Sequence, residues 1–229
     1  SLNAALELFS DEFGFDPSSD ANDSTSKPYC GAMKLTEALM GQDLLGVHPK
    51  SAFRCDGFDA TGVTDLYPAG VKAEDVKDRK GPYLQAENAN AFRMSDIYGK
   101  GKTGAFPEDT YVLCDVFEKK RLSGKKTGMP ILYYRANRLG NAHQAGDPNN
   151  IYDYRDNLAL VSLGVPGEPN MVHPLIDPKR FYLNTQDVRV KSSPQPCRAD
   201  SFILISAGSD GLYGTADDIC NFDWRYRER

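Results

Sequence analysis

Apolar residues at helical spacing predict a helix at the very start of the chain. Four of them recur at intervals of four, three and four residues and so form one stripe: Leu2, Leu6, Phe9 and Phe13. Gly14 and Pro17 end the pattern, because glycine accepts the left-handed conformation that follows many helices and proline cannot continue one. Since the stripe runs up to Ser1, we expect this helix to continue upstream of the sequence.

A second apolar stripe predicts a helix over residues 31–45, which a glycine and a proline close. Its members are Ala32, Leu35, Ala38 and Leu39. From about residue 50 to 108 the chain is polar and its periodicity is weak. This stretch predicts loops, isolated strands and one short helix near residues 73–79.

Runs of β-forming residues predict strands in the second half of the chain. Residues 111–117 and 131–136 are separated by a basic turn, 118–126, and we expect them to pair as a hairpin. Two further strands, 202–206 and 219–224, lie near the end. The last one alternates, with one face formed by Cys220, Phe222, Trp224 and Tyr226. A period of two with one buried face is typical of an antiparallel sheet.

The composition fits one globular domain. Of 229 residues, 40% are hydrophobic and 26% charged, which is ordinary for a folded protein. The net charge of −5 gives no reason to expect a nucleic-acid partner. The longest apolar runs, such as Phe202–Ile205, cover four residues, whereas a membrane-spanning helix needs about 20. We predict a single α+β domain over residues 1–229.

The five cysteines argue against a structural zinc site, because they include no C-x-x-C pair and no histidine at ligand spacing. Cys197 and Cys220 flank the final pair of strands and are the first candidates for a disulfide. Five reduced thiols are the alternative.

The loop between the last two predicted strands is rich in glycine and aspartate. Asp210, Asp217 and Asp218 fall within nine residues of it. Carboxylates held this close repel one another unless a cation or several backbone N–H groups lie between them. Hard oxygen ligands on a bend that glycine permits suit Ca²⁺. We therefore predict a calcium site here, and a solvated acidic loop is the alternative.

Two familiar ligand-binding patterns do not fit. After Asp210, an EF-hand needs carboxylates or amides two and four residues on, where Leu212 and Gly214 stand. Residues 96–103 look like the second half of a phosphate-binding loop, but Asp96 occupies the position of its first glycine and would repel phosphate. Nucleotide binding is therefore not expected.

A second oxygen-rich site is conceivable in the polar stretch 137–157. His143, Asp147, Asp153 and Asp156 lie there, and a solvated loop explains them equally well. The three histidines belong to no recognised motif, so we expect surface or hydrogen-bonded residues and not catalysts: His48, His143 and His173.

Three stretches of the chain carry a family resemblance. Residues 2–17 look like the point where the long first helix of a pseudopilin leaves the membrane and ends in a glycine–proline turn. Leu35–Leu39 resembles the short second helix of that family. Residues 205–224 are similar to the C-terminal calcium loop of the major pseudopilin of type II secretion systems. The stretch from about 50 to 200 is longer than the usual pseudopilin sheet region and matches none of it.

The resemblance implies a filament subunit and not an enzyme. Its fold would be α+β, with a helical spine packed on an antiparallel sheet and long loop insertions in the middle. The upstream part of the helix would anchor the protein in the inner membrane of a bacterial cell envelope, with the head in the periplasm. Its partners would be other pseudopilin subunits, in homo- and hetero-assembly, the inner-membrane secretion machinery and the membrane itself, and no nucleic acid.

The same resemblance assigns side-chain ligation of calcium to Asp217 and Asp218, and then to Asp210 and Thr215. Backbone carbonyls would complete the shell, and the ion would order the loop and stabilise the head for assembly. Two other classes of protein remain open. One is a secreted calcium-dependent binding module whose middle loops hold a ligand. The other is a secreted hydrolase that uses carboxylates of the polar stretches, which requires a cleft with convergent acids.

Overall fold

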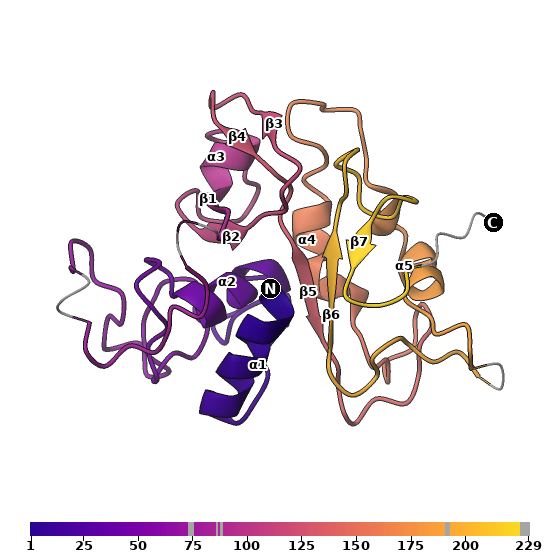
Figure 1. Cartoon of the computed structure of the whole chain (residues 1–229), viewed down its shortest axis with the longest axis horizontal. Helices are drawn as coiled ribbons and strands as arrows, with labels where there is room; N and C mark the ends of the chain where they lie inside the picture. The colour runs from indigo at the N-terminus through magenta and orange to yellow at the C-terminus, as the bar shows by residue number, and fades with distance from the viewer. Residues whose placement is uncertain (73–75, 86, 88, 191–192, 225–229) are drawn as a thin grey trace.

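The fold is α+β, as predicted, with short helices around three small antiparallel sheets (Figure 1). The computed structural model describes residues 1–72, 76–85, 87, 89–190 and 193–224. The α-helices are α1 (Leu2–Phe13), α2 (Gly31–Met40), α3 (Met94–Tyr98), α4 (Leu158–Val161) and α5 (Pro178–Asn184). Two 3-10 helices, η3 (Tyr154–Asn157) and η4 (Pro174–Ile176), lie beside α4 and α5. The strands are β1 (Ala91–Arg93), β2 (Tyr111–Leu113), β3 (Lys119–Lys120), β4 (Lys126–Thr127), β5 (Leu132–Arg135), β6 (Phe202–Ser206) and β7 (Ile219–Cys220).

Helix α1 covers the apolar stripe and ends where the sequence predicts. The Ser1 hydroxyl accepts a hydrogen bond from the Ala4 N–H at 3.4 Å, and Gly14 follows the last turn with a φ of 77°. This left-handed conformation favours glycine and lets its N–H bind the Ser10 carbonyl. The apolar stripe faces α2, and Phe9 is fully buried.

Helix α2 is shorter than predicted. It begins at Gly31 as expected but ends at Met40, not at residue 45. Gly41 has a φ of 78°, and a Cβ there would lie 2.1 Å from the Gly46 carbonyl oxygen. The chain therefore closes back on itself directly after the helix, in a bend that a side chain at residue 41 would block.

All ten residues of α2 are buried, including its polar ones. At its first turn the Asn157 side chain accepts from the Ala32 N–H at 2.9 Å and donates to the Tyr133 carbonyl at 2.8 Å. A Cβ on Gly31 would come within 2.1 Å of that same carbonyl oxygen. The helix start is thus pressed against β5 at a distance that only glycine allows.

The polar side chains of α2 are satisfied by loops that are distant in sequence. The Lys34 ammonium donates to the carbonyls of Asp20 and Asn22 at 2.8 and 2.9 Å. The Thr36 hydroxyl accepts from the Leu113 N–H of β2 at 2.9 Å. Buried polar groups without such partners destabilise a fold, so each bond fixes one segment against the helix.

Glu37 of α2 is the most heavily bonded of these side chains and is 1% exposed. Its carboxylate accepts from the hydroxyls of Tyr29 (2.7 Å), Ser51 (2.5 Å) and Tyr67 (3.0 Å) and from the Gln42 amide (3.0 Å). Burial raises the pKa of Glu37, against these four hydrogen bonds, which lower it. The Glu37 carboxylate thus binds residues at both ends of the loop 42–67 and Ser51 within it.

The hairpin predicted between residues 111–117 and 131–136 forms only in part. Strand β2 is three residues long and pairs with β1, while β5 pairs with β6. The two segments meet in a bridge between Cys114 and Pro130, and the short β3–β4 ladder continues it. Pro130 has no N–H to donate, and the Asp115 carboxylate binds the N–H groups of Phe117 and Met129. A regular ladder cannot extend through these positions.

The last strand is also shorter than predicted, because β7 covers only Ile219–Cys220. Beyond it the Asn221 side chain replaces the backbone. Its oxygen accepts from the Leu204 N–H at 2.9 Å and its amide donates to the Phe202 carbonyl at 3.3 Å. Phe222 and Trp224 still pack against the core, as the alternation indicated, and Tyr226 lies outside the described residues.

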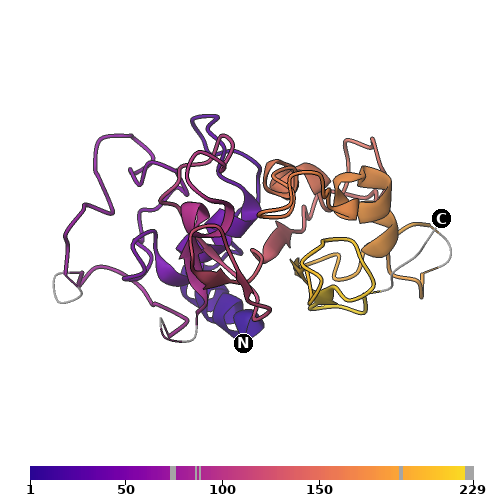
Figure 2. The same cartoon turned by 90° about the horizontal axis from the view of Figure 1, so that it is seen from above.

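In the β5–β6–β7 sheet, the residues of β5 and β6 are buried apart from the half-buried Arg135, whereas Ile219 of β7 is exposed. Strand β5 lies between the two halves of the molecule (Figure 2). In β5, the Tyr133 hydroxyl reaches the Pro17 carbonyl at 2.8 Å, and the neighbouring Tyr134 ring packs on Phe181 of α5. Successive side chains of a strand point to opposite faces. All five residues of β6 are buried, which fits a strand covered on both sides.

Three other predictions can be compared with the structure. Of the helix near 73–79, residues 73–75 lie outside the described residues, and the turn at 77–78 is not helical. All five cysteines are thiols, so the Cys197–Cys220 disulfide is not formed. Within the described residues, no helix has both the length and the apolar character needed to cross a bilayer.

The Glu37 network predicts a large and local effect of mutation. Glu37→Ala leaves one buried donor, Tyr29, and three half-buried donors without this acceptor, and we expect it to lower the free energy of unfolding by about 3 kcal/mol. Glu37→Gln keeps one acceptor oxygen and should cost less. Denaturant unfolding measures both, and limited proteolysis should open the loop 42–67 first. Glu7→Ala, on the exposed side of α1, is the control. Equal unfolding midpoints for the two alanine variants would contradict this role.

Candidate functional site

The acidic loop, residues 207–218, joins β6 to β7 and is anchored by Tyr213. This side chain is fully buried, and its hydroxyl donates to the Pro130 carbonyl. Its N–H donates to His173 Nδ1 at 3.2 Å, and its carbonyl accepts from the Leu175 N–H at 3.0 Å. The middle of the loop is therefore held rigidly by a segment 40 residues away.

The Asp217 carboxylate closes the loop from its C-terminal side. One oxygen accepts from the Ser209 hydroxyl at 2.8 Å and the Asp210 N–H at 3.0 Å, and the other lies 2.7 Å from the Thr215 hydroxyl. Burial raises the pKa of Asp217, but these hydrogen bonds outweigh it and hold the pKa well below its usual range. Asp217 is therefore a carboxylate over the whole physiological pH range.

The neighbouring Asp218 lies in a different environment, with 7% of its surface exposed. Its two oxygens accept from the N–H groups of Gly214 (2.8 Å) and Thr215 (3.2 Å). Burial raises the pKa of Asp218 to about 7 despite these bonds, and the charge of Asp210 adds to the increase. A buried carboxylate of this kind is stabilised by either a proton or a cation.

The Thr215 hydroxyl connects the two aspartates and has more acceptors around it than it can serve. It lies 2.7 Å from Asp217 Oδ1, 3.2 Å from Asp218 Oδ1 and 3.2 Å from the Leu212 carbonyl oxygen. A hydroxyl has one proton to donate. The Thr215 hydroxyl thus supplies one proton for three acceptor oxygens.

Asp210 lies beside this cluster, but its carboxylate is not part of it. Its carboxylate accepts from the Leu212 N–H at 2.7 Å, and its carbonyl accepts from the Lys119 ammonium at 2.7 Å. The structure thus brings together three of the four predicted ligands, Thr215, Asp217 and Asp218. Asp210 contributes through its backbone N–H and its charge.

The donor set of this cluster fits a hard cation. It consists of two carboxylates, a hydroxyl and a carbonyl, all oxygen, on a bend formed by Gly211 and Gly214 with φ values of 75° and 93°. Calcium takes six to eight oxygen ligands, so further carbonyls or waters would be needed. Within the described part of the chain, no three His, Cys, Asp or Glu side chains converge as a metal site. The cluster therefore depends on Thr215 and backbone oxygens as well as on carboxylates.

Sequence reasoning missed four residues that support the loop: Ser209, Lys119, His173 and Trp224. Ser209 lies inside the acidic stretch, and its position beside Asp210 was a usable signal. The Trp224 indole donates to the Thr215 carbonyl at 2.8 Å. Lys119 and His173 reach the loop from distant segments, and nothing in the sequence pattern indicates it.

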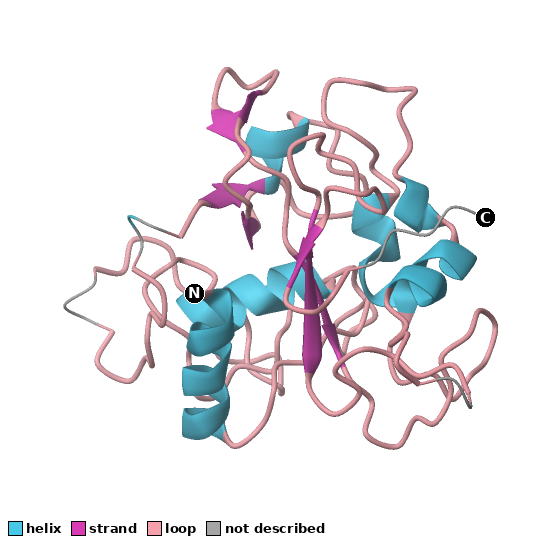
Figure 3. Ribbon diagram, turned by 45° about the vertical axis from the view of Figure 1, so that its right-hand side comes forward, coloured by secondary structure: helices cyan, strands magenta, loops and turns pink. Residues whose placement is uncertain are grey.

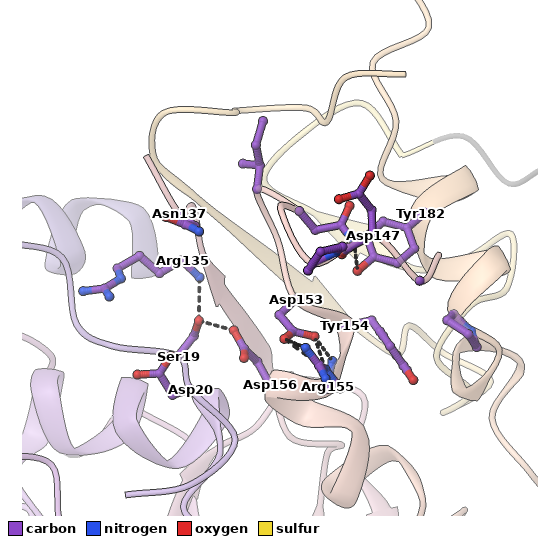
Figure 4. A pocket seen from close by; sticks show the side chains of 15 residues that line it. Ser19, Asp20, Arg135, Asn137, Asp147, Asp153, Tyr154, Arg155, Asp156 and Tyr182 are labelled. Carbon is purple, nitrogen blue, oxygen red and sulfur yellow. Dashed lines mark hydrogen bonds and ion pairs between the residues drawn. The ribbon is translucent and has the colours of Figure 1, made fainter. Parts of the chain in front are cut away.

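A second candidate site is a polar pocket of about 700 Å³ that Arg135 of β5 helps to line (Figure 4). It collects Asp20, Asp147, Asp153 and Asp156, together with the tyrosines Tyr154 and Tyr182. Three carboxylates of the stretch 137–157 therefore do share one cavity. His143 is not part of its wall, since it is buried beside Tyr182 with Nε2 3.1 Å from the Thr185 hydroxyl.

The carboxylates of this pocket are already engaged and do not converge on one point. Asp153 binds the Arg155 guanidinium at 2.7 Å, and Asp156 accepts from the Ser19 hydroxyl at 2.5 Å, as Figure 4 shows. Burial raises the pKa of Asp156 well above its usual range. For Asp153, burial acts in the same direction, but the Arg155 bonds outweigh it and lower the pKa. Burial and ion pairing thus shift the pKa values of the two acids in opposite directions.

Comparison with known proteins identified no relative. No protein-family model matches the chain, and no curated protein and no solved structure is significantly similar to it.

His173 makes the anchoring of the loop sensitive to acid. Burial lowers its pKa from 6.5 to about 4, so the unfolded chain takes up a proton that the folded chain refuses. The stability that neutral His173 contributes is present above pH 6.5 and is lost as the pH falls towards 4. His173→Asn keeps an acceptor for the Tyr213 N–H without this titration.

We expect the difference in unfolding free energy between wild type and His173→Asn to change by up to about 3 kcal/mol between pH 7 and pH 4, since one pKa unit corresponds to about 1.4 kcal/mol. Denaturant unfolding at a series of pH values measures it. All other groups titrate in both proteins, so their contributions cancel. A difference that does not vary with pH would show that His173 is not buried in its neutral form.

Proposed function

We propose that this chain is the head domain of a pseudopilin-like filament subunit whose C-terminal loop is stabilised by calcium. The observation that carries the proposal is the oxygen cluster of Leu212, Thr215, Asp217 and Asp218, in which acceptors exceed protons. It lies between the last two strands, where the resemblance of residues 205–224 to the calcium loop of the major pseudopilin would put it.

The order and packing of the elements also favour this function. A first helix is followed by a short second helix, which packs on the β5–β6–β7 sheet, and the acidic loop connects the last two strands of that sheet. In the proposed subunit, α1 would continue upstream into the inner membrane, and neighbouring subunits would pack along it in a helical assembly. The long stretch from residue 50 to 130 would be an elaboration of this core.

Bound calcium would supply positive charge to a set of oxygens that otherwise repel one another. Residues of the chain itself hold these oxygens in place. Tyr213 and His173 fix the bend, and Ser209 orients the Asp217 carboxylate. The ion would thereby stabilise further the loop that joins β6 to β7 and the surface that this loop offers to neighbouring subunits. The role is structural, and it needs no catalytic group.

The calcium site predicts a cation-dependent stability. Ligand at about 100 times its dissociation constant adds about 2.7 kcal/mol, which corresponds to roughly 5–10 °C in a chain of this size. Thermal melting in calcium and in chelator should differ by this amount, and magnesium should not replace calcium. Asp217→Asn combined with Asp218→Asn should remove the difference.

The matched control is Asp11→Ala with Asp200→Ala, which makes the same change in net charge at two exposed positions. It should keep the full calcium effect. Identical melting midpoints of the wild type with calcium and with chelator would refute the calcium site, and so would an equal loss in the control.

The filament role has a separate test in the gene sequence upstream of the Ser1 codon. A pseudopilin requires a prepilin cleavage site followed by about 20 apolar residues with a glutamate near the mature N-terminus. A cleavable signal peptide in that position would instead favour a secreted protein and would contradict the filament role.

The pocket of Figure 4 favours a second candidate function, a secreted binding module. Its volume falls within the usual range for ligand sites, and carboxylates, amides and tyrosine rings suit a polyhydroxylated ligand such as a sugar. Because burial raises the pKa of Asp156 and the Arg155 bonds lower that of Asp153, the two acids would offer different hydrogen-bonding groups to the hydroxyls of such a ligand. Most residues of this pocket belong to the middle of the chain, for which the filament role proposes no function.

A thermal-shift series with mono- and disaccharides tests the binding module. It predicts a raised midpoint for wild type and a smaller shift, by at least half, for Asp153→Asn. Asp187→Asn is a close control, because Asp187 binds Arg189 two residues on, just as Asp153 binds Arg155. No sugar-dependent shift in any protein would remove this candidate.

A further inference from the structure

The β3–β4 hairpin concentrates positive charge in a chain that is acidic as a whole. Residues 119–126 include four exposed lysines and one buried arginine, with no acidic residue among them, whereas the whole chain carries −5. The resulting basic hairpin projects from the end of the molecule where α3 lies (Figures 1 and 3).

The two faces of the basic hairpin differ. On the inner face, Lys119 donates to the Asp210 carbonyl at 2.7 Å, and Arg121 donates to Thr127 Oγ1 at 3.0 Å and the Gly128 carbonyl at 3.1 Å. These cations are used in folding. On the outer face, Lys120 lies directly opposite Lys126 in the ladder.

Like charges directly opposite each other destabilise a strand pair. Within the described part of the chain, neither Lys120 nor Lys126 forms an ion pair that would offset this repulsion. An external anion would relieve it. The outer face therefore has charge that the fold itself does not use.

An apolar side chain stands at the tip of the basic hairpin. Leu122 is 67% exposed and lines a shallow groove of about 490 Å³ together with Lys100 and Lys102. Asp96, the carboxylate in that groove, is paired with Lys125 at 2.8 Å. Four lysines of the outer face and the groove thus accompany one exposed leucine: Lys100, Lys102, Lys120 and Lys126.

We infer that this surface docks on an anionic lipid bilayer, with the lysines at the headgroups and Leu122 at the boundary of the acyl chains. Basic residues beside an exposed apolar side chain suit such an interface, and each lysine near an anionic surface contributes about 1 kcal/mol. Lysines also bind nucleic-acid phosphates, but the outer face of the hairpin has no aromatic ring on which bases would stack, and the exposed Leu122 suits a bilayer better.

The basic hairpin lies at the top edge of the molecule, beyond α3, whereas the first residue of α1 lies near the middle of the same view (Figure 1). The docking surface therefore rests on the charges and the exposure of the hairpin, and it does not depend on the filament function proposed above.

Co-sedimentation with vesicles tests the docking surface. The chain should bind vesicles of phosphatidylcholine with about 30% phosphatidylglycerol at low salt, bind less as salt increases, and not bind pure phosphatidylcholine. Lys120→Glu converts the repulsive pair with Lys126 into an attractive one. It should therefore lower binding about tenfold or more while the melting midpoint stays equal or rises. Leu122→Ser should weaken binding several-fold without a change in charge.

Lys179→Glu, at an exposed position of α5, makes the same change in net charge and should bind like the wild type. Absence of wild-type binding, or an equal loss in Lys179→Glu, would overturn the inference. Stronger binding to a DNA duplex than to the anionic vesicles would replace the lipid with a nucleic acid. Calcium is not needed at any step, so failure of the calcium site would leave these outcomes unchanged.

Discussion

The burial of α2 on every side is the constraint on which the rest of the structure depends. Its apolar face forms the core, but Lys34, Thr36 and Glu37 are buried as well and must find partners inside the protein. The loop 18–22, strand β2 and the loop 42–67 provide them. A chain with little regular structure is thereby held by a few buried hydrogen bonds to one helix. At the N-terminal end of α2, Gly31 and Asn157 attach the helix to β5. Strand β5 in turn belongs to the sheet that carries the acidic loop.

The acidic loop also contains buried polar groups, but around Thr215 it has more hydrogen-bond acceptors than donors. In α2 each buried acceptor meets enough donors, whereas at Thr215 one proton faces three acceptor oxygens. Asp218 is buried and has its pKa raised to about 7, and Asp217 beside it remains ionised. Tyr213 and His173 hold this arrangement in place, so the loop does not relax by moving its oxygens apart. Either a proton on Asp218 or a cation completes such a set, and the proposed stabilising role rests on the cation.

The sequence predicted those parts of the fold in which local pattern and environment agree. Helix α1, the start of α2 and strand β6 follow directly from apolar spacing and glycine. The polar face of α2 reads as solvent-exposed by the same logic, and only the return of distant loops buries it. Strand β7 is cut short because the Asn221 side chain takes over the ladder, and β2 pairs with β1, whose three residues carry no strand signal. At the candidate site, glycine and aspartate located the loop, but the contributions of His173 and Lys119 come from tertiary packing.

The most direct test of the oxygen cluster is a crystal structure of the chain grown in calcium and measured at a wavelength where calcium scatters anomalously. The account predicts one anomalous peak about 2.3–2.6 Å from oxygens of Asp217 and Asp218, with the Leu212 carbonyl or Thr215 in its shell. A loop without a peak, in which the Thr215 hydroxyl still bridges the two aspartates, would contradict it.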